Sequence, residues 1–318
     1  MSLFFATFFS LFQSVLVIFI IALIAGILVH KGVLNDHVVR SLSQVTVQIL
    51  LPSLIFSSIA GHLDVKDLPV WWIIPLISSG TTAIGFGLGF LFFMRDLPSK
   101  RNLIPLSAMM NAGYFILPIG QVVFTGQFER FALFVSLYIL GVSPLIWSVG
   151  KYFMTGNPRE TGNWKQMITP PLIANLLGIF MVLTNLNRMI PTAVMDAVDM
   201  LGKATVAIAT LILGATFGKL SFHLHIPPWD VIRVILIKLF LVPAIMVTLL
   251  LIFPLYRNYP LLNDLLILEA SAPAATALII QIRRYGGDEH TVGGVLLISY
   301  LVCLLTVPFW LAIWRTIL

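Results

Sequence analysis

The stretch LLILEASAPAAT, residues 265–276, lies inside an apolar run that extends from about residue 260 to residue 282. It places the carboxylate of Glu269 and the helix-breaking Pro273 near the middle of a segment long enough to cross a membrane. A carboxylate at that depth is costly unless it faces a partner, an ion or water. The stretch therefore predicts an interrupted membrane helix with a functional group at the interruption.

The composition is that of an integral membrane protein. Of the 318 residues 59% are hydrophobic and only 10% are charged, with a mean hydropathy of +1.00. Soluble domains carry about 25% charged residues. The apolar runs are continuous rather than alternating, which predicts an all-α membrane protein. The formal net charge of +6 is spread over short loops, so it indicates no nucleic-acid partner and is better explained by orientation in the lipid bilayer.

Ten apolar segments are long enough to be transmembrane helices. A polar stretch at 156–166 separates residues 1–155 from residues 167–318 and is predicted to be a cytoplasmic linker between five-helix halves. Because five is odd, the second half must enter the membrane in the opposite orientation, which is the inverted-repeat plan of secondary transporters. The predicted segments are 4–29, 38–60, 70–94, 103–125, 131–154, 168–184, 192–219, 229–254, 260–282 and 292–313.

A second interruption, NAGYFILP at residues 111–118, lies in the fourth segment. Its asparagine and glycine favour non-helical geometry, and Pro118 follows in the first turns of the helix that resumes. Broken helices in matching places of two halves predict a crossing at a transport site, where half-helix N-termini favour an anion and freed carbonyls favour a cation. The alternative is a kinked helix whose Asn111 bonds a neighbour.

The two interruptions supply the predicted site. Glu269 is open to three interpretations, which are a sodium ligand, a proton carrier and a structural partner of an interfacial lysine. A sodium site needs several oxygens, which backbone carbonyls, Asn111, Ser271, Thr276 and Gln48 would supply. The residues predicted to bind substrate are Asn111, Gly113, Pro118, Ser271, Pro273 and Thr276.

Other polar and glycine motifs are given structural roles. Asp199 and Lys203 stand at i, i+4 in the seventh segment, and we expect them to pair with each other rather than with an anionic substrate. Gly85, Gly87 and Gly89 lack the strand and spacing of a nucleotide-binding fingerprint and are predicted to pack helices closely. No Ser/His/Asp order or paired carboxylates suggest catalysis, so the chain is predicted not to be an enzyme.

Basic residues in the predicted loops set the expected topology. Eleven Lys and Arg residues, Lys31 and Arg95 among them, fall on one side of the membrane, and five, including Lys66 and Arg130, fall on the other. The positive-inside rule places the richer side in the cytoplasm. We therefore expect a multi-pass protein of the cell inner or plasma membrane with both termini outside the cytoplasm.

The motif Asn111-x-Gly113 with Leu117-Pro118 resembles the signature of the auxin efflux carrier family, as does ASAPAA at residues 270–275 running on to RRYGGD at residues 283–288. The likeness covers the whole chain. It implies ten helices, crossing fourth and ninth helices, and a scaffold of helices 1, 2, 6 and 7 that forms a homodimer. Helices 3–5 and 8–10 would then move as a transport domain in an elevator mechanism.

The resemblance also implies the cargo, because relatives move auxin or dicarboxylates such as malate. The sequence lacks the long central loop of the plant carriers, which favours a microbial organic-acid carrier. Glu269 departs from many relatives and is similar to the acidic residue of bile acid:sodium symporters. That likeness implies a Na⁺ site at Glu269, Asn111 and Gln48, with no other cofactor.

The sequence therefore predicts a secondary transporter of small organic anions that is coupled to Na⁺ or H⁺. The alternatives are a sodium-dependent symporter of the bile-acid type and an uncoupled channel or sensor on the same fold.

Overall fold

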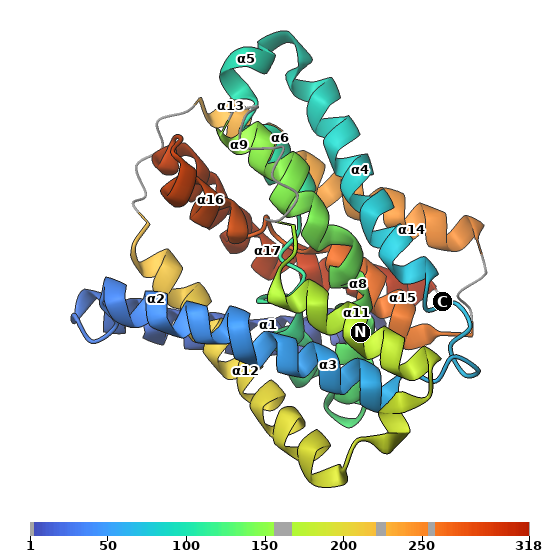
Figure 1. Cartoon of the computed structure of the whole chain (residues 1–318). Coiled ribbons are helices and arrows are strands. Elements are labelled where there is room, and N and C mark those ends of the chain that lie inside the picture. Colours follow the sequence, from blue (N-terminus) through green and yellow to red (C-terminus); the bar gives the residue numbers. More distant parts are fainter. Residues whose placement is uncertain (1–2, 156–166, 221–226, 254–257, 318) are drawn as a thin grey trace.

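The computed structural model describes residues 3–155, 167–220, 227–253 and 258–317, and these ranges are helical apart from their connections and one isolated two-residue bridge (Figure 1). The predicted linker at 156–166 lies outside the described residues. The prediction of an all-α membrane protein is confirmed in this part of the chain.

Seven helical spans in the described ranges are long and apolar enough to cross a membrane. Four of them consist of α1 (Leu3–His30), α4 (Ile73–Phe93, continued by the short turn Met94–Asp96), α12 (Thr192–Gly218) and α17 (Glu289–Ile317). The other three contain a wider π-helical turn. They are α2–η1–α3 (Asp36–Val45, Thr46–Leu50, Leu51–His62), η3–α8–η4–α9 (Thr125–Gln127, Phe128–Leu145, Ile146–Gly150, Lys151–Thr155) and α13–η7–α14 (Pro228–Leu236, Ile237–Leu241, Val242–Ile252).

Each π-helical turn lies beside a proline. Pro52 and Pro243 begin the helices that follow η1 and η7, and Pro144 lies just before η4. Proline lacks the N–H that would bond one turn back, and its ring crowds the carbonyl there. A wider turn accommodates both defects without ending the span, so these prolines bend the helices rather than break them.

The other predicted segments take different forms. The sixth, predicted at 168–184, is the helix α11 (Pro170–Leu183), whose 14 residues extend only about 21 Å at 1.5 Å per residue. The fourth consists of α6 (Leu103–Ala108) and α7 (Ile116–Val123). The ninth consists of α15 (Pro260–Ser271) and α16 (Ala277–Tyr285). A ten-span topology therefore depends on one short helix and two interrupted ones.

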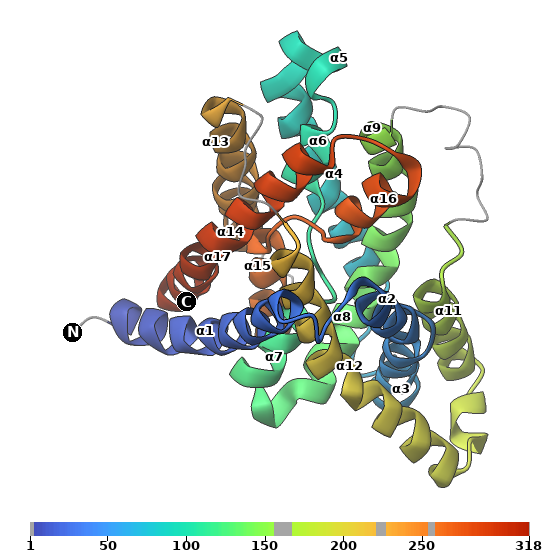
Figure 2. The same cartoon turned by 90° about the vertical axis from the view of Figure 1, so that its left-hand side faces the viewer.

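Two groups of helices are visible in both cartoon views. α1 packs along α12, and α3 packs against both α11 and α12. The second group lies largely above the first in Figure 2, where α4 contacts α6 and α8, and α15 contacts α14 and α17. The groups touch along α1 and α17 and along α3 and α8.

Small residues allow the closest helix contacts. A Cβ atom added at Gly214 of α12 would lie 2.2 Å from the carbonyl oxygen of Ala22 in α1, so these two backbones approach each other directly. In α4 a Cβ at Gly85 would lie 2.6 Å from Cα of Ala108, and one at Gly89 would lie 2.5 Å from a serine oxygen of α6. The packing role predicted for these two α4 glycines is confirmed, whereas a Cβ at Gly87 meets no atom within 4 Å.

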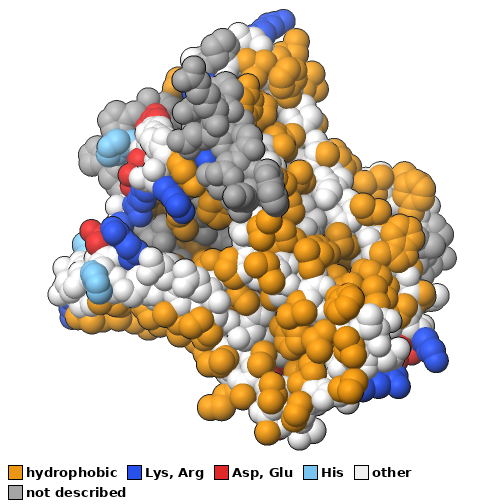
Figure 3. All heavy atoms as spheres, in the orientation of Figure 1, with side chains coloured by type: hydrophobic (Ala, Val, Ile, Leu, Met, Phe, Trp, Pro, Cys, Tyr) orange, Lys and Arg blue, Asp and Glu red, His pale blue; other side chains and the backbone are white. Residues whose placement is uncertain are grey.

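The surface fits a lipid environment. Hydrophobic side chains cover much of the face in Figure 3, and charged side chains gather near its edges. α11 alone exposes Ile173, Leu176 and Phe180. Exposed aliphatic and aromatic side chains on seven apolar spans show a multi-pass membrane protein.

Candidate substrate site at the crossing of two broken helices

The two interruptions pair with each other through their backbones. The N–H of Asn111 donates to the carbonyl of Pro273 at 3.0 Å, and the N–H of Ala275 donates to the carbonyl of Met109 at 3.1 Å. The segments run antiparallel, with Met110 opposite Ala274. Figure 2 shows the two extended segments between α6 and α7 and between α15 and α16. Backbone groups that the broken helices leave free are thus satisfied inside the protein, as the apolar environment requires.

Asn111 joins the two segments through its side chain as well. Its Nδ2 donates to Thr276 Oγ1 at 3.3 Å and to the hydroxyl of Tyr300 on α17, while its Oδ1 accepts from the N–H of Tyr114 at 3.2 Å. The last bond is a local side-chain-to-backbone bond of the kind that competes with helix formation. Asn111 therefore holds the non-helical backbone between α6 and α7 and also bonds its neighbours, so one residue has the features of both interpretations.

The helix ends at the crossing have opposite polarity. α7 and α16 begin there and direct unpaired N–H groups toward it, while α6 and α15 end there. Pro118 lies in the first turn of α7, where its missing N–H costs nothing. Gly113 is half-buried, and its carbonyl accepts from the N–H of Leu117 at 3.2 Å. The arrangement can receive an anion at the two N-termini.

The hydroxyl of Ser271 lies at the end of α15 and turns back into its own helix. It donates to the carbonyls of Ile267 and Leu268 at 2.8 and 3.2 Å. Ser271 is fully buried, as is Pro273, whose carbonyl already accepts from Asn111. These two predicted substrate residues therefore shape the backbone at the crossing, and in this conformation their polar atoms are engaged.

Glu269 lies two residues before the end of α15, and its side chain is fully buried. Neither carboxylate oxygen has a hydrogen-bond donor among the described residues. The carboxyl group of Glu269 interacts electrostatically with Lys238 of η7, which is also fully buried. It interacts in the same way with the hydroxyl of Tyr138 on α8. Lys238 is buried rather than interfacial, so the three interpretations of Glu269 stay predictions.

Gln48 takes a different position. It lies on η1, and its side chain is exposed, whereas Glu269 and Asn111 are buried. Gln48 therefore differs in exposure from the other two predicted sodium ligands, and the sodium site at Glu269, Asn111 and Gln48 stays a prediction.

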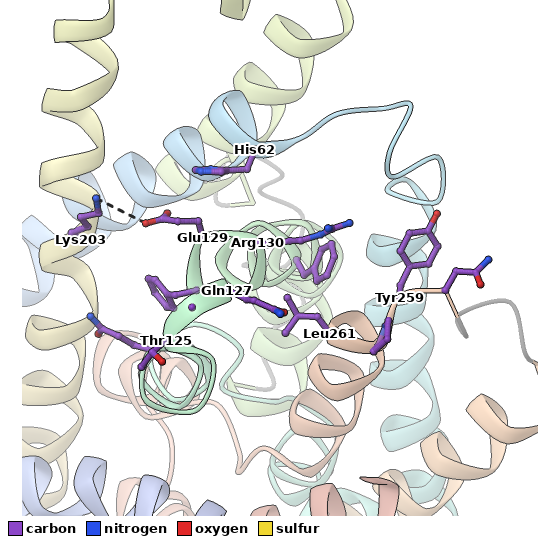
Figure 4. Close-up of a pocket in the computed structure, with 14 residues that line it drawn as sticks. His62, Thr125, Gln127, Glu129, Arg130, Lys203, Tyr259 and Leu261 are labelled. Atoms are coloured by element: carbon purple, nitrogen blue, oxygen red, sulfur yellow. Dashed lines mark ion pairs between the residues drawn. The ribbon is translucent and has the colours of Figure 1, made fainter. Parts of the chain in front are cut away.

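A cavity of about 1040 Å³ lies away from the crossing, on the face where the second set of basic residues was predicted. Figure 4 shows His62 from the end of α3, Glu129 and Arg130 from the start of α8, and Lys203 from α12 around it. Gln121 of α7 also lines the cavity, so it reaches the half-helix that begins at the crossing. No sequence motif indicated this cavity, because its walls are span ends that meet only in the fold.

Lys203 has two carboxylate partners at this cavity. Its Nζ lies 2.6 Å from Asp199, so the predicted i, i+4 pair is confirmed. The same nitrogen lies 3.9 Å from Oε1 of Glu129, across the cavity wall. Both Lys203 and Glu129 are exposed enough for water to screen this second contact, which makes it a weak link.

Polar contacts divide the described chain in one consistent way. The scaffold set contains α1, α2–α3, α11, the short helix η6 (Leu186–Met189) and α12, and the transport set contains the remaining helices. Among the described residues, every ion pair and every side-chain hydrogen bond between separate elements lies within one set, except the pair of Lys203 and Glu129.

Two of the shortest ion pairs show this division. Asp36 and Lys219, 2.6 Å apart, join α2 to the end of α12 within the scaffold set. Asp264 and Arg315, also 2.6 Å apart, join α15 to α17 within the transport set. At the end of α5 (Leu97–Lys100), Lys100 donates to the buried Asp230 of α13, and this hydrogen bond is the main reason that the pKa of Lys100 is raised.

Comparison with known proteins agrees with this geometry. A family model described as a membrane transport protein matches residues 10–162 and again residues 159–311. The chain belongs to the auxin efflux carrier family. The two matches meet at residues 159–162, between the two halves of the sequence.

Two full-length relatives are similar to this member of the family. An uncharacterised transporter of Methanothermobacter thermautotrophicus is 25% identical over 305 residues, which cover 94% of this chain and 96% of the relative. An uncharacterised transporter of Methanocaldococcus jannaschii is also 25% identical over 305 residues, covering 93% and 96%.

Proposed function

We propose that this family member is a secondary active transporter of small organic anions, such as malate-like dicarboxylates, that works by elevator-type alternating access. The observation that carries the proposal is the backbone pairing of Asn111 with Pro273, because it brings two half-helix N-termini to one point inside the membrane. Such termini favour negative charge, and discontinuous helices at the midplane form the substrate sites of many secondary transporters.

The division of polar contacts supports a moving transport set. An elevator requires one rigid body to slide past another, and directional bonds between the bodies would have to break at each cycle. The scaffold and transport sets meet through apolar packing, with one weak ionic link between Lys203 and Glu129 among the described residues. The exposed apolar faces of α11 and α12 suit a homodimer contact through the scaffold set.

The proposal includes ten spans in two inverted halves, with both termini outside the cytoplasm and the molecule in the cell membrane. In that orientation the cavity at Lys203 opens to the outside and the ion pair of Lys100 with Asp230 faces the cytoplasm. Coupling to a cation gradient, Na⁺ or H⁺, would involve the carboxylate of Glu269.

Uptake by purified protein in proteoliposomes tests the proposal. Radiolabelled malate, malonate and succinate are offered with and without gradients of sodium and protons. We expect saturable uptake of at least one of them, accelerated by unlabelled anion on the opposite side. Asn111→Ala should abolish uptake, because it removes the side chain that joins the broken helices.

Asn102→Ala is the matched control. Asn102 lies just before α6 and makes no capping hydrogen bond. Its substitution should leave uptake unchanged. Uptake without saturation or counterflow would indicate an uncoupled pore instead. If Asn111→Ala and Asn102→Ala transport equally well, the crossing is not part of the substrate site.

A further inference from the structure

Tyr300 of α17 lies against the crossing, and only 1% of it is exposed. Its hydroxyl accepts a hydrogen bond from the side chain of Asn111. Its ring also meets the edge of Phe115, which directly precedes α7, with the ring centroids 5.4 Å apart. A single side chain of the transport set thus contacts both the amide of Asn111 and the start of a half-helix.

A second aromatic contact of Tyr300 reaches the scaffold set. The ring of Phe217, one residue before the end of α12, lies 4.5 Å from the Tyr300 ring, with the two planes inclined at 62°. Aromatic pairs at such separations attract each other beyond the area that they bury. The ring that touches the scaffold set is therefore the ring whose hydroxyl bonds Asn111.

The end of α12 is held on the scaffold set by α1. A Cβ atom added at Gly218 would lie 2.8 Å from Cα of Gly26 in α1. One turn earlier, a Cβ at Gly214 would meet the backbone of Ala22. Helix backbones that approach each other this closely pack as one unit. Phe217 lies between these two contacts in the chain, so it stays with α1 when α17 moves.

The same end of α12 lies along one face of α17. A Cβ atom added at Gly293 would lie 2.7 Å from Cδ2 of Leu220, two residues past α12. Gly293 precedes Tyr300 by about two helical turns, so both lie on that face. A slide of α17 by one turn is about 5.4 Å. At right angles to the line between the ring centres, it would increase the separation of Tyr300 and Phe217 from 4.5 Å to about 7 Å, the outer limit for an aromatic pair.

We propose that Tyr300 is a positioning residue that makes the anion site proposed at the crossing sensitive to the position of the scaffold set. In this conformation Phe217 supports the ring of Tyr300, and the hydroxyl of Tyr300 fixes the amide of Asn111. When α17 slides, the ring loses this support and the amide is held less firmly. A ligand shifts a conformational equilibrium only through different affinities for the two states, and Tyr300 supplies such a difference. The inference rests on the proposed function.

The kinetics of malate, malonate or succinate uptake into proteoliposomes test the inference. Phe217→Leu keeps an apolar side chain but removes the ring, whereas Tyr300→Phe keeps the ring but removes the hydroxyl. Each should raise KM about 2–10-fold, the factor that corresponds to one hydrogen bond of ordinary strength, and change the maximal rate less. The double variant should raise KM no further than the larger single effect, because both changes break the same link.

Phe4→Leu is the matched control. Phe4 is a half-buried phenylalanine of the scaffold set whose ring contacts Phe309 of α17 at 6.1 Å, and neither ring carries a group that can hydrogen-bond to Asn111. Its substitution should leave KM unchanged. An equal rise of KM for Phe4→Leu and Phe217→Leu would overturn the inference, because any loosened contact between the two sets would then have this effect. An unchanged KM for Tyr300→Phe would overturn it as well.

Melting temperature without substrate separates this inference from the proposed function. Asn111→Ala and Phe217→Leu are measured singly and together in detergent. A link through Tyr300 predicts that the double variant loses less than the sum of the single losses, by about 1–4 °C. If Asn111→Ala does not fold, Tyr300→Phe replaces it, since it removes the same hydrogen bond. Additive losses overturn the inference. Non-additive losses without uptake of any offered anion support the link at Tyr300, whereas the proposed function then fails.

Discussion

Replacing Asn111 with alanine should destabilise the protein through the crossing itself. The side chain donates to Thr276 and to Tyr300 and accepts from the N–H of Tyr114, so the substitution removes three hydrogen bonds at once. Only 7% of Asn111 is exposed, and the hydroxyl of Tyr300 is fully buried. Water therefore cannot easily replace the lost partners.

The expected magnitude follows from those three bonds. Hydrogen bonds between membrane helices contribute on average about 0.6 kcal/mol each, and buried bonds in proteins generally about 0.5–1.5 kcal/mol. Three of them together give about 2–4 kcal/mol. The upper part of the range applies because Tyr300 is left with a buried hydroxyl group lacking its partner.

Unfolding in mixed micelles with increasing sodium dodecyl sulfate measures this free energy, with helical circular dichroism as the signal. Asn102→Ala is again the control, and it should change the free energy of unfolding by less than about 0.5 kcal/mol, as surface substitutions usually do. A loss for Asn111→Ala that is no larger than for the control would refute the reasoning, because the crossing would then contribute nothing to stability.

Two other predictions concern the helix packing and the motion. Gly214→Ala should lower the free energy of unfolding by about 1–3 kcal/mol, since its Cβ would collide with the α1 backbone. Gly87→Ala is the control, because a Cβ there meets no atom within 4 Å and the substitution should be neutral. Thermal unfolding measures both variants. Cysteines at Lys203 and Glu129, joined by a cleavable bifunctional reagent, should stop uptake until the reagent is cleaved, because the link ties the scaffold set to the transport set.

The cross-linking prediction has an internal control. Cysteines at Asp36 and Lys219 join two helices of the scaffold set, and their cross-link should leave uptake unchanged. The natural Cys303 is buried and adds little background reaction. Full uptake by protein cross-linked between positions 203 and 129 would show that the two sets do not move relative to each other there.

The interruptions were readable in the sequence because their causes are local. Asparagine, glycine and proline change the backbone wherever they stand, so the breaks at Asn111 and Pro273 follow from residue chemistry alone. Their pairing followed from matching places in two halves. The sixth predicted span was harder, because hydropathy does not show that the helix itself ends after 14 residues.

Partners on uninterrupted helices could not be read in the same way. Tyr300 lies within the continuous apolar helix α17. Its hydroxyl reaches Asn111 at the crossing because of the rotation of α17 about its own axis. Lys238 is buried on a π-helical turn that no pattern of hydrophobic residues marks. Gln48 and Gln44 share a face by helical spacing, but that spacing gives no information on whether the face is buried, and Gln48 is exposed.

The pairing of the two broken helices also sets an interval during synthesis. Asn111 and Thr276 are 165 residues apart in the chain, and ribosomes add roughly 5–20 residues per second. For about 8–33 s the first half is in the membrane while the N–H of Asn111 and the carbonyl of Met109 have no backbone partner. Newly made first halves therefore carry unpaired polar groups that lipid cannot satisfy, and faster completion of the chain shortens that exposure.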